Sequence, residues 1–314
     1  MIVSPWRIVF FGTPTFAIST LKNLLQGPDE VAAVVTQPDR EKGRGRKVIP
    51  SPVKELALQH GLIIFQPEKV KEEAFQEKIK ILQPELFVVV AYGQILTNSL
   101  LKIPIHGAVN VHASLLPKYR GAAPIPWAIL KGDEVTGVTT IMMDEGMDTG
   151  DILLQTETPI GEEETSETLH DRLALLGAKL LLETVSRMKA GNVRPIPQDH
   201  LKTTYAPPLK KEDGRIDWSK EAKEIDRQVR ALNPWPGAYT EWNGQLLKIY
   251  RGEVRKGLPT GERGVVAWVG SDFVEVETGK DSFLIKEVQL EGKRRMSVLD
   301  FLAGHPISPG TAFQ

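Results

Sequence analysis

Residues 7–36 read RIVFFGTPTFAISTLKNLLQGPDEVAAVVT, and this stretch contains the pattern that decides the fold. RIVFF (7–11) is a short, largely apolar run that ends at Gly12, and VAAVVT (31–36) is a second run of this kind. Runs of this length and composition, bounded by glycine, predict β-strands. Apolar residues between the runs recur at helical spacing, which predicts a helix over 15–26. A strand, a helix and a second strand in this order predict a parallel sheet.

The same alternation continues along the first half of the chain. FVVVA (87–91) is uninterrupted by polar residues, as is typical of a central strand buried on both faces of a parallel sheet. Ser51 precedes a predicted helix as its N-cap, with a proline at the first helical position and Gly61 just past the end. Further strands are predicted at 62–65, 86–92 and 108–113, and further helices at 52–60 and 69–82. We therefore predict an α/β, Rossmann-like domain with a mostly parallel sheet.

Two strands and a long helix end this domain. GVTTIMM (137–143) and DILLQTET (151–158) lie close together in the sequence, which predicts a hairpin at one side of the sheet. Leucines then step by three and four residues through a long predicted helix over 165–190. The first domain is predicted to cover residues 1–190.

The remaining residues have a different pattern. Residues 191–208 contain four prolines and no period, which predicts an interdomain linker. A C-terminal domain over 209–314 then opens with a predicted helix at 219–232. Short strands with glycine-rich turns follow, which is typical of a small β-barrel of the OB type. These strands are predicted at 246–254, 264–269, 273–278 and 282–290.

The composition excludes several classes of protein. Lys and Arg number 39 against 40 Asp and Glu, so a uniformly basic nucleic-acid-coating protein and an acidic disordered protein are excluded. Cysteine is absent, which excludes disulfides, a thiol nucleophile and thiolate metal sites. The longest apolar run, 86–92, is too short to span a bilayer. Gly12 and Pro14 interrupt the N-terminal apolar run too early for a signal peptide, so we expect a cytoplasmic protein.

The first strand–helix turn, FFGTPTFA, departs from the dinucleotide-binding fingerprint. That fingerprint needs three glycines, and here only Gly12 is present, with Pro14 in the place of the second. Gly12 is interpreted as the residue of a tight turn. A nicotinamide-dependent oxidoreductase is therefore disfavoured.

AVNVHA (108–113) carries the first candidate catalytic residues. Asn110 and His112 are two positions apart on a predicted strand, so their side chains share one face. An amide donor beside an imidazole suits a carbonyl oxygen that becomes an oxyanion. The pair stands where the strand ends, and in open α/β sheets ligands bind at this edge. The alternative is a structural histidine beside an asparagine that ends the strand.

A second polar cluster, MDEGMDTGDIL (143–153), lies between the two strands of the predicted hairpin. Its acidic residues do not have the spacing of a calcium-binding loop, so no metal is expected. Asp148 stands between nearby glycines and is interpreted as a carboxylate that orients the histidine. The alternative is that the acidic residues only shape a turn. They are Asp144, Glu145, Asp148 and Asp151.

The loop QPDREKGRGRK (37–47) is strongly basic. The loop contains five cationic residues and two carboxylates, which gives it a local net charge of +3 in a nearly neutral protein. Such a loop suits an anionic partner such as a phosphate backbone, and the alternative is a solvated loop without a partner. The cations are Arg40, Lys42, Arg44, Arg46 and Lys47.

These motifs together closely resemble the methionyl-tRNA formyltransferase family. The resemblance runs along nearly the whole chain and in the right order. NVHASLLP with a downstream D-T-G-D is shared more widely among enzymes that use 10-formyltetrahydrofolate, whereas the basic loop and the C-terminal segments indicate the tRNA enzyme. The motifs are FGTPTFA (11–17), GRGRK (43–47), NVHASLLPKYRGAAPI (110–125), MDEGMDTGDIL (143–153) and NPWPGA (233–238).

The resemblance implies transfer of a formyl group from 10-formyltetrahydrofolate to the α-amino group of methionine on initiator tRNA, for translation initiation. It places the catalytic group at Asn110, His112 and Asp148. It implies that Arg44 contacts the acceptor arm, that the C-terminal domain binds tRNA, and that the protein acts as a monomer without a metal. The segment similar to the family's folate-binding residues is Ser114, Leu115, Leu116 and Pro117.

Three questions stay open at the level of sequence. A formyltransferase acting on an amino sugar nucleotide would share the folate motifs, and a non-catalytic RNA-binding protein could share the architecture. His112 has two available roles, either as a cation that stabilises the oxyanion or as the base that takes the proton of the amine.

Overall fold

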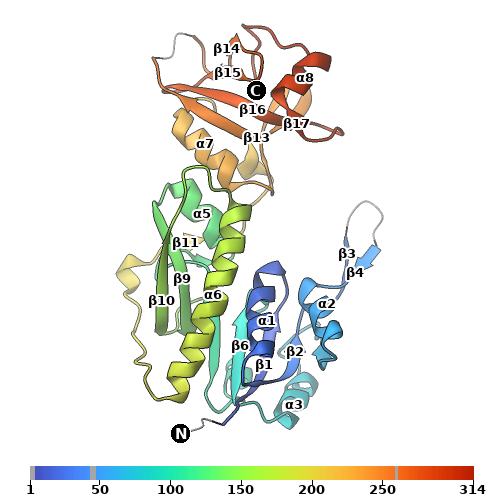
Figure 1. Cartoon of the computed structure of the whole chain (residues 1–314), viewed down its shortest axis with the longest axis vertical. Coiled ribbons are helices and arrows are strands. Elements are labelled where there is room, and N and C mark those ends of the chain that lie inside the picture. The colour runs from blue at the N-terminus through green and yellow to red at the C-terminus, as the bar shows by residue number, and fades with distance from the viewer. Residues whose placement is uncertain (1–3, 43–46, 259–260) are drawn as a thin grey trace. The chain divides into compact units, whose positions relative to one another are not determined.

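The computed structural model describes residues 4–42, 47–258 and 261–314 and divides the chain into two compact units (Figure 1). The predicted domain boundaries at 190 and 208 stay a prediction. The contacts between segments divide the chain at other positions than these boundaries. The first unit gathers Met1–Pro124, Val135–Pro159 and His170–Ala206, and the second gathers Ile125–Glu134, Ile160–Leu169 and Pro207–Gln314.

A seven-stranded sheet forms the centre of the first unit, in the order β10-β9-β7-β6-β1-β2-β5. The pairs β5–β2, β2–β1, β1–β6 and β6–β7 are parallel, and β7–β9 and β9–β10 are antiparallel. The predicted mostly parallel sheet and the hairpin beside it are confirmed. The strands are β1 (Arg7–Gly12), β2 (Glu30–Val35), β5 (Ile64–Phe65), β6 (Leu86–Val90), β7 (Ala108–His112), β9 (Val135–Met142) and β10 (Ile152–Pro159).

Helices cover both faces of this sheet. On one face, residues of β1, β6 and β7 share a buried apolar cluster with Phe75 of α3 and Leu100 of α4. On the other face lie α1 and α6, which run side by side in Figure 1. The Ser51 hydroxyl accepts a hydrogen bond from the Lys54 backbone and caps α2, as predicted. The helices are α1 (Ile18–Gln26), α2 (Pro52–Gln59), α3 (Glu73–Ile81), α4 (Asn98–Leu101) and α6 (Ser166–Lys189), and a 3₁₀ turn, η1 (Thr15–Ala17), precedes α1.

Gly177 shows which strand residues α6 covers. A Cβ atom at this position would lie 2.8 Å from Val111 Cγ1 and 3.3 Å from Val138 Cγ1, so only glycine lets the helix approach this closely. Val111 therefore faces α6. Because side chains alternate along a strand, its neighbours Asn110 and His112 face the opposite side of the sheet.

The second unit contains a six-stranded antiparallel sheet in which β12-β13-β16-β15-β14 are neighbours and β17 pairs with β16. The last residues of the chain join its two outer strands. Gln314 exchanges backbone hydrogen bonds with Glu241 of β12, and Phe313 N donates to Gly264 O just before β14. The predicted small β-barrel domain is confirmed. Its strands are β12 (Ala238–Trp242), β13 (Gln245–Arg255), β14 (Val266–Val269), β15 (Val274–Glu277), β16 (Ser282–Leu290) and β17 (Met296–Ser297).

Several short elements were not predicted. β3 and β4 form an antiparallel hairpin within the basic loop, and β8 pairs in parallel with β11, which lies in the segment predicted to be a linker. Within the described ranges, no helix combines the length and apolar content that crossing a bilayer requires. The helix predicted at 219–232 is present as α7 (Ala222–Ala231). The remaining elements are β3 (Arg40–Lys42), β4 (Lys47–Ile49), β8 (Arg120–Gly121), β11 (Tyr205–Ala206), α5 (Pro124–Lys131), α8 (Val298–Gly304), η2 (His200–Lys202) and η3 (Glu212–Gly214).

Candidate active site

Strand β7 carries the first two predicted catalytic residues at its carboxyl end. Asn110 and His112 are buried, with 9% and 6% of their surface exposed. Asn110 stands opposite Val89 of β6, whose side chain belongs to the apolar cluster on the α3 face. Both polar side chains therefore point to this face, as their spacing predicts.

The loop between β9 and β10 brings Asp148 to this pair. Asn110 Nδ2 donates to Asp148 Oδ1 at 3.4 Å, and His112 Nδ1 lies 3.6 Å from Asp148 Oδ2. The backbone of Asp148 is in the left-handed region, with φ of 54°, which is uncommon for a residue other than glycine. The structure thus brings the three predicted catalytic side chains together, although they come from two separate segments of the chain.

One hydrogen bond of the His112 ring fixes the position of one of its protons. Nε2 is 2.9 Å from the backbone oxygen of Tyr119. A carbonyl oxygen only accepts, so Nε2 carries a proton and donates it. Nδ1 faces the Asp148 carboxylate, which also only accepts when ionised. The ring of His112 is therefore held by the Tyr119 carbonyl with its other nitrogen turned toward the Asp148 carboxylate.

Asp148 receives a further hydrogen bond, from the Gly121 backbone N–H to Oδ2 at 2.9 Å. This contact and the Tyr119 carbonyl come from the same short segment, whose residues were not predicted to contact the catalytic group. The available signal was the motif KYRGA, which directly follows the segment similar to the folate-binding residues.

The other acidic residues of the loop do not join this group. Asp144 Oδ1 accepts from Gly146 N at 3.0 Å and from Thr149 Oγ1 at 2.5 Å, so Asp144 shapes the turn. Glu145 accepts a hydrogen bond from Asn98 of α4. The alternative interpretation of the acidic cluster as turn residues therefore holds for Asp144.

The four predicted folate-binding residues follow β7 directly. Ser114 is fully buried, and its hydroxyl donates to Lys118 O at 2.6 Å. Leu116 is also buried, and its backbone N–H donates to Thr139 Oγ1 of β9 at 3.1 Å. Only Leu115 and Pro117 of this segment are partly exposed. A ligand at this segment would thus meet the backbone and these two side chains.

The basic loop is only partly described. Arg40 lies in β3 and is exposed, and the backbones of Lys42 and Lys47 lie in β3 and β4. Arg44 and Arg46 lie outside the described residues. Near the start of the loop, hydrogen bonds from Lys54 and Gln66 hold the pKa of the Asp39 carboxyl below its usual value. Lys54, which lies outside the loop, therefore balances the charge of Asp39.

Gly12 has a packing role. A Cβ atom here would lie 2.7 Å from a Phe10 ring carbon and 2.9 Å from Ala17 Cβ. The strand and the start of the helix therefore approach each other too closely for any side chain. Gly12 is therefore the residue of a tight turn, as its sequence context predicts.

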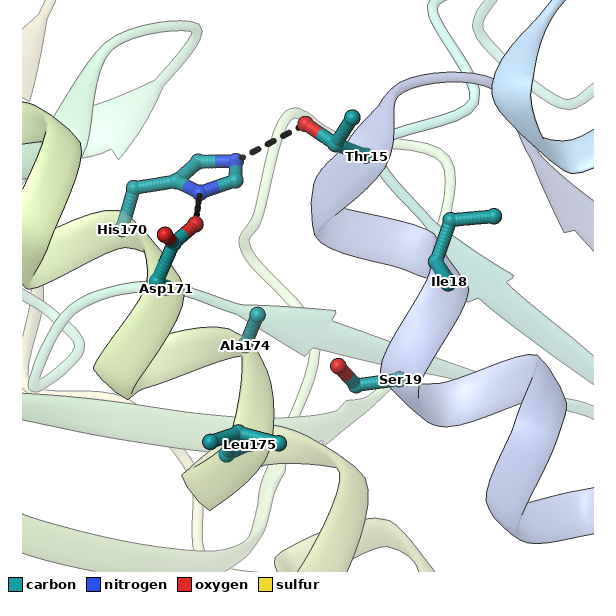
Figure 2. A pocket seen from close by; sticks show the side chains of 7 residues that line it. All are labelled: Thr15, Ile18, Ser19, His170, Asp171, Ala174 and Leu175. Carbon is teal, nitrogen blue, oxygen red and sulfur yellow. Dashed lines mark hydrogen bonds and ion pairs between the residues drawn. The ribbon is translucent and has the colours of Figure 1, made fainter.

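A separate pocket of about 280 Å³ lies between α1 and α6 (Figure 2). His170 Nε2 is 3.5 Å from Thr15 Oγ1, and His170 Nδ1 is 2.9 Å from Asp171 Oδ1. The pocket lies beside α6, on the face opposite to Asn110 and His112. It is therefore distinct from the candidate active site. Its lining residues are Thr15, Ile18, Ser19, His170, Asp171, Ala174 and Leu175.

Clustered side chains of the kinds that bind metals are a further feature of interest. Among the residues that the structure describes, no group of three or more His, Cys, Asp or Glu side chains could hold a metal ion. The expectation that no metal takes part stays a prediction.

Two protein families match this chain. Residues 6–185 match the family described as formyl transferase, and residues 208–306 match the formyl transferase C-terminal domain. These matches show that the chain is a formyltransferase, an enzyme that transfers a one-carbon formyl group. Methionyl-tRNA formyltransferase from Citrifermentans bemidjiense is 52% identical over 97% of this chain and 95% of its own length. The corresponding enzyme from Pelobacter propionicus is 53% identical over 98% of this chain and 96% of its own length. The chain belongs to the methionyl-tRNA formyltransferase family.

Solved structures share the fold at lower sequence identity. WlaRD, a sugar 3N-formyltransferase, superposes with a TM-score of 0.68 at 20% identity, over 92% of this chain and 99% of its own. HypX from Aquifex aeolicus, solved with tetrahydrofolic acid, has a TM-score of 0.62 at 18% identity, over 99% of this chain and 51% of its own. These likenesses confirm the fold of a formyltransferase.

Proposed function

We propose that this chain transfers the formyl group of 10-formyltetrahydrofolate to the α-amino group of methionine esterified to initiator tRNA. The observation that supports this most directly is the convergence of Asn110, His112 and Asp148 at the carboxyl edge of the sheet. Membership of the family supports the tRNA substrate, and a folate in a fold neighbour supports the donor. We further propose that the protein acts as a monomer in the cytoplasm.

The reaction needs a site that stabilises negative charge on oxygen. The neutral α-amine attacks the formyl carbon, and the carbonyl oxygen becomes an oxyanion. The Asn110 amide has two N–H groups, one of which points to Asp148. The second N–H is the donor that we assign to the oxyanion. Such a donor accelerates the reaction because it is already oriented where the charge develops.

His112 and Asp148 form the second part of the mechanism. As the new C–N bond forms, the amine loses a proton. As the bond from the formyl carbon to N10 of the folate breaks, N10 gains one. Because Nε2 of His112 is held by the Tyr119 carbonyl, Nδ1 is the nitrogen that exchanges the proton beside Asp148. The carboxylate stabilises the imidazolium ion while it carries the charge.

The two substrates are assigned to different parts of the chain. The donor folate lies along Ser114, Leu115, Leu116 and Pro117, next to the catalytic residues. The catalytic domain covers 1–190, a linker covers 191–208, and the C-terminal domain over 209–314 binds tRNA. The tRNA also meets the cations of the basic loop, which are Arg40, Lys42, Arg44, Arg46 and Lys47.

A formylation assay tests the proposed activity. With 10-formyltetrahydrofolate, the purified protein is expected to formylate methionyl initiator tRNA and to leave methionyl elongator tRNA largely unmodified. Formylation of a UDP-amino sugar in place of the tRNA would contradict the proposal and favour the sugar enzyme. Binding of tRNA without any formyl transfer would favour the non-catalytic RNA-binding protein.

A test of Arg44 separates specific recognition from simple charge. Arg44→Ala and Arg44→Lys are both expected to lower formylation, because lysine lacks the planar set of donors with which arginine contacts a specific group. Phosphate contacts by charge alone are salt-dependent and tolerate lysine. Activity is measured at two salt concentrations.

The control for this test is Arg187→Lys, an exposed arginine of α6 that pairs with Glu183. This variant is expected to keep normal activity. If Arg44→Lys equals the unmodified protein at both salt concentrations, then Arg44 contributes charge only.

A further inference from the structure

The segment predicted to be a linker supplies part of the first unit. Ile196 exchanges two backbone hydrogen bonds with Ile152 at the start of β10, both of 2.9 Å. Further along, Thr204 O accepts from Arg120 N at 2.9 Å, and Thr204 Oγ1 accepts from Tyr119 N at 2.8 Å. Residues 196–206 therefore contact both loops that surround the candidate active site.

Gln198 stands between these two loops and is 5% exposed. Its Nε2 donates to the backbone oxygen of Asp148 at 2.9 Å and to that of Gly150 at 2.7 Å. Its Oε1 accepts from Arg120 Nε at 3.1 Å and from Arg120 Nη2 at 2.6 Å. Both N–H groups and both lone pairs of the amide are thus in use, which leaves only one orientation for the side chain.

Arg120 joins this amide to the other side of the site. It is 3% exposed, and its guanidinium binds Gln198 through two nitrogens. Its sequence neighbours are the residues that contact the catalytic group, since Tyr119 O accepts from His112 and Gly121 N donates to Asp148. The Arg120–Gln198 side-chain pair therefore connects the backbone segments on both sides of the His112–Asp148 contact.

The backbone of Asp148 needs such a support. Its φ of 54° is a conformation that side-chain-bearing residues adopt at a cost and keep only where surrounding contacts hold them. The bond from Gln198 to the Asp148 carbonyl is made at this residue itself. The Asp148 carboxylate contacts both His112 and Asn110, and it can do so only if its own backbone keeps this position.

We propose that Gln198, oriented by Arg120, is a positioning residue for formyl transfer that holds the Asp148 carboxylate against His112 and Asn110. This inference rests on the proposed roles of those three residues. Gln198 acts through the backbone at Asp148 and Gly150 and touches none of the three catalytic side chains. Its removal therefore affects the chemical step more than the binding of either substrate.

Gln198→Glu is the main test, because it keeps the size of the side chain and the contact with Arg120. A carboxylate has no N–H, so both bonds to backbone oxygens are lost. We expect kcat to fall by about 10- to 100-fold, the effect of a displacement on the order of 1 Å at a catalytic group. The KM values for tRNA and for the folate are expected to stay unchanged. Gln198→Met, which lacks both charge and hydrogen bonds, is expected to show the same split between kcat and KM.

Gln228→Glu is the matched control. Gln228 of α7 is 9% exposed, and its Nε2 donates to the backbone oxygens of Asp213 and Arg215 at 2.8 and 3.0 Å. Gln228→Glu therefore removes two hydrogen bonds from a side-chain amide to backbone oxygens, as Gln198→Glu does, but in the second unit. Its kcat is expected to be normal, while its melting temperature falls as much as that of Gln198→Glu.

A double substitution decides whether Gln198 acts through Asp148. In an Asp148→Asn background, Gln198→Glu is expected to lower kcat no further, because the group that it positions is already lost. If Gln198 acts independently of Asp148, the double variant loses kcat by the product of the two single losses, and this result would overturn the inference. A kcat for Gln198→Glu and Gln198→Met equal to that of Gln228→Glu would also overturn it.

A wrong assignment of the catalytic residues would give a different result from a wrong assignment of Gln198. If Asp148→Asn alone keeps full kcat, the assignment of Asp148 is wrong and the inference falls with it. If Asp148→Asn is inactive while both Gln198 variants are normal, only the positioning role is wrong.

Discussion

Asp148→Asn is expected to lower kcat by about 10³- to 10⁴-fold, the size of loss found when a carboxylate that orients a catalytic histidine becomes an amide. The substitution keeps the shape of the side chain and removes its charge. Nδ1 of His112, 3.6 Å away, then loses the anion that stabilises its protonated form. The measurement is kcat for formylation of methionyl initiator tRNA, with the KM for tRNA expected to stay unchanged.

Asp151→Asn provides the comparison within the same loop. Asp151 is exposed, and the change of charge is identical. Normal turnover is expected for this variant. Equal losses in the two variants would show that the loop responds to net charge and that Asp148 has no special role.

Asn110→Ala is expected to reduce kcat by about 10²- to 10³-fold, which corresponds to about 3 to 4 kcal/mol for the loss of one oxyanion donor. Asn110 is buried beside Asp148 and offers the amide N–H that we assign to the developing oxyanion. Binding of tRNA is expected to remain unchanged, because this side chain is assigned to the transition state. Turnover equal to that of the unmodified protein would remove Asn110 from the mechanism.

Asn110→Asp sharpens this test. The side chain keeps its size, but an oxygen replaces the amide nitrogen at a position 3.4 Å from Asp148 Oδ1. Two carboxylates in contact repel each other, and neither donates a hydrogen bond while ionised. The loss of kcat is therefore expected to exceed that of Asn110→Ala, whereas a purely space-filling role for Asn110 predicts the opposite order.

The main elements of the fold could be predicted from local patterns. FVVVA (87–91) indicated a strand buried on both faces, and Leu86–Val90 is indeed fully buried between β1 and β7. Asn110 and His112 were placed on one face by their spacing alone, and the structure confirms this placement. Such predictions succeed because strand alternation and helical periodicity are properties of neighbouring residues.

Short elements were the main misses. α4 has four residues and β8 and β11 have two each, which is too few to show a period. β8 and β11 also exist only because residues 85 positions apart pair, with Arg120 opposite Tyr205. A local pattern contains no information about such a partner.

The sequence by itself determined the alternating strands and helices of the first domain, the small second domain, and the candidate catalytic residues Asn110, His112 and Asp148. Tertiary structure alone decided that Asp148 meets the other two, which group each ring nitrogen of His112 faces, and that Gln198 of the predicted linker contacts the Asp148 backbone. The physical reason is the range of the interactions involved. Hydrophobic periodicity acts between near neighbours, whereas a buried side-chain amide finds its partners wherever the folded backbone leaves carbonyl oxygens to satisfy.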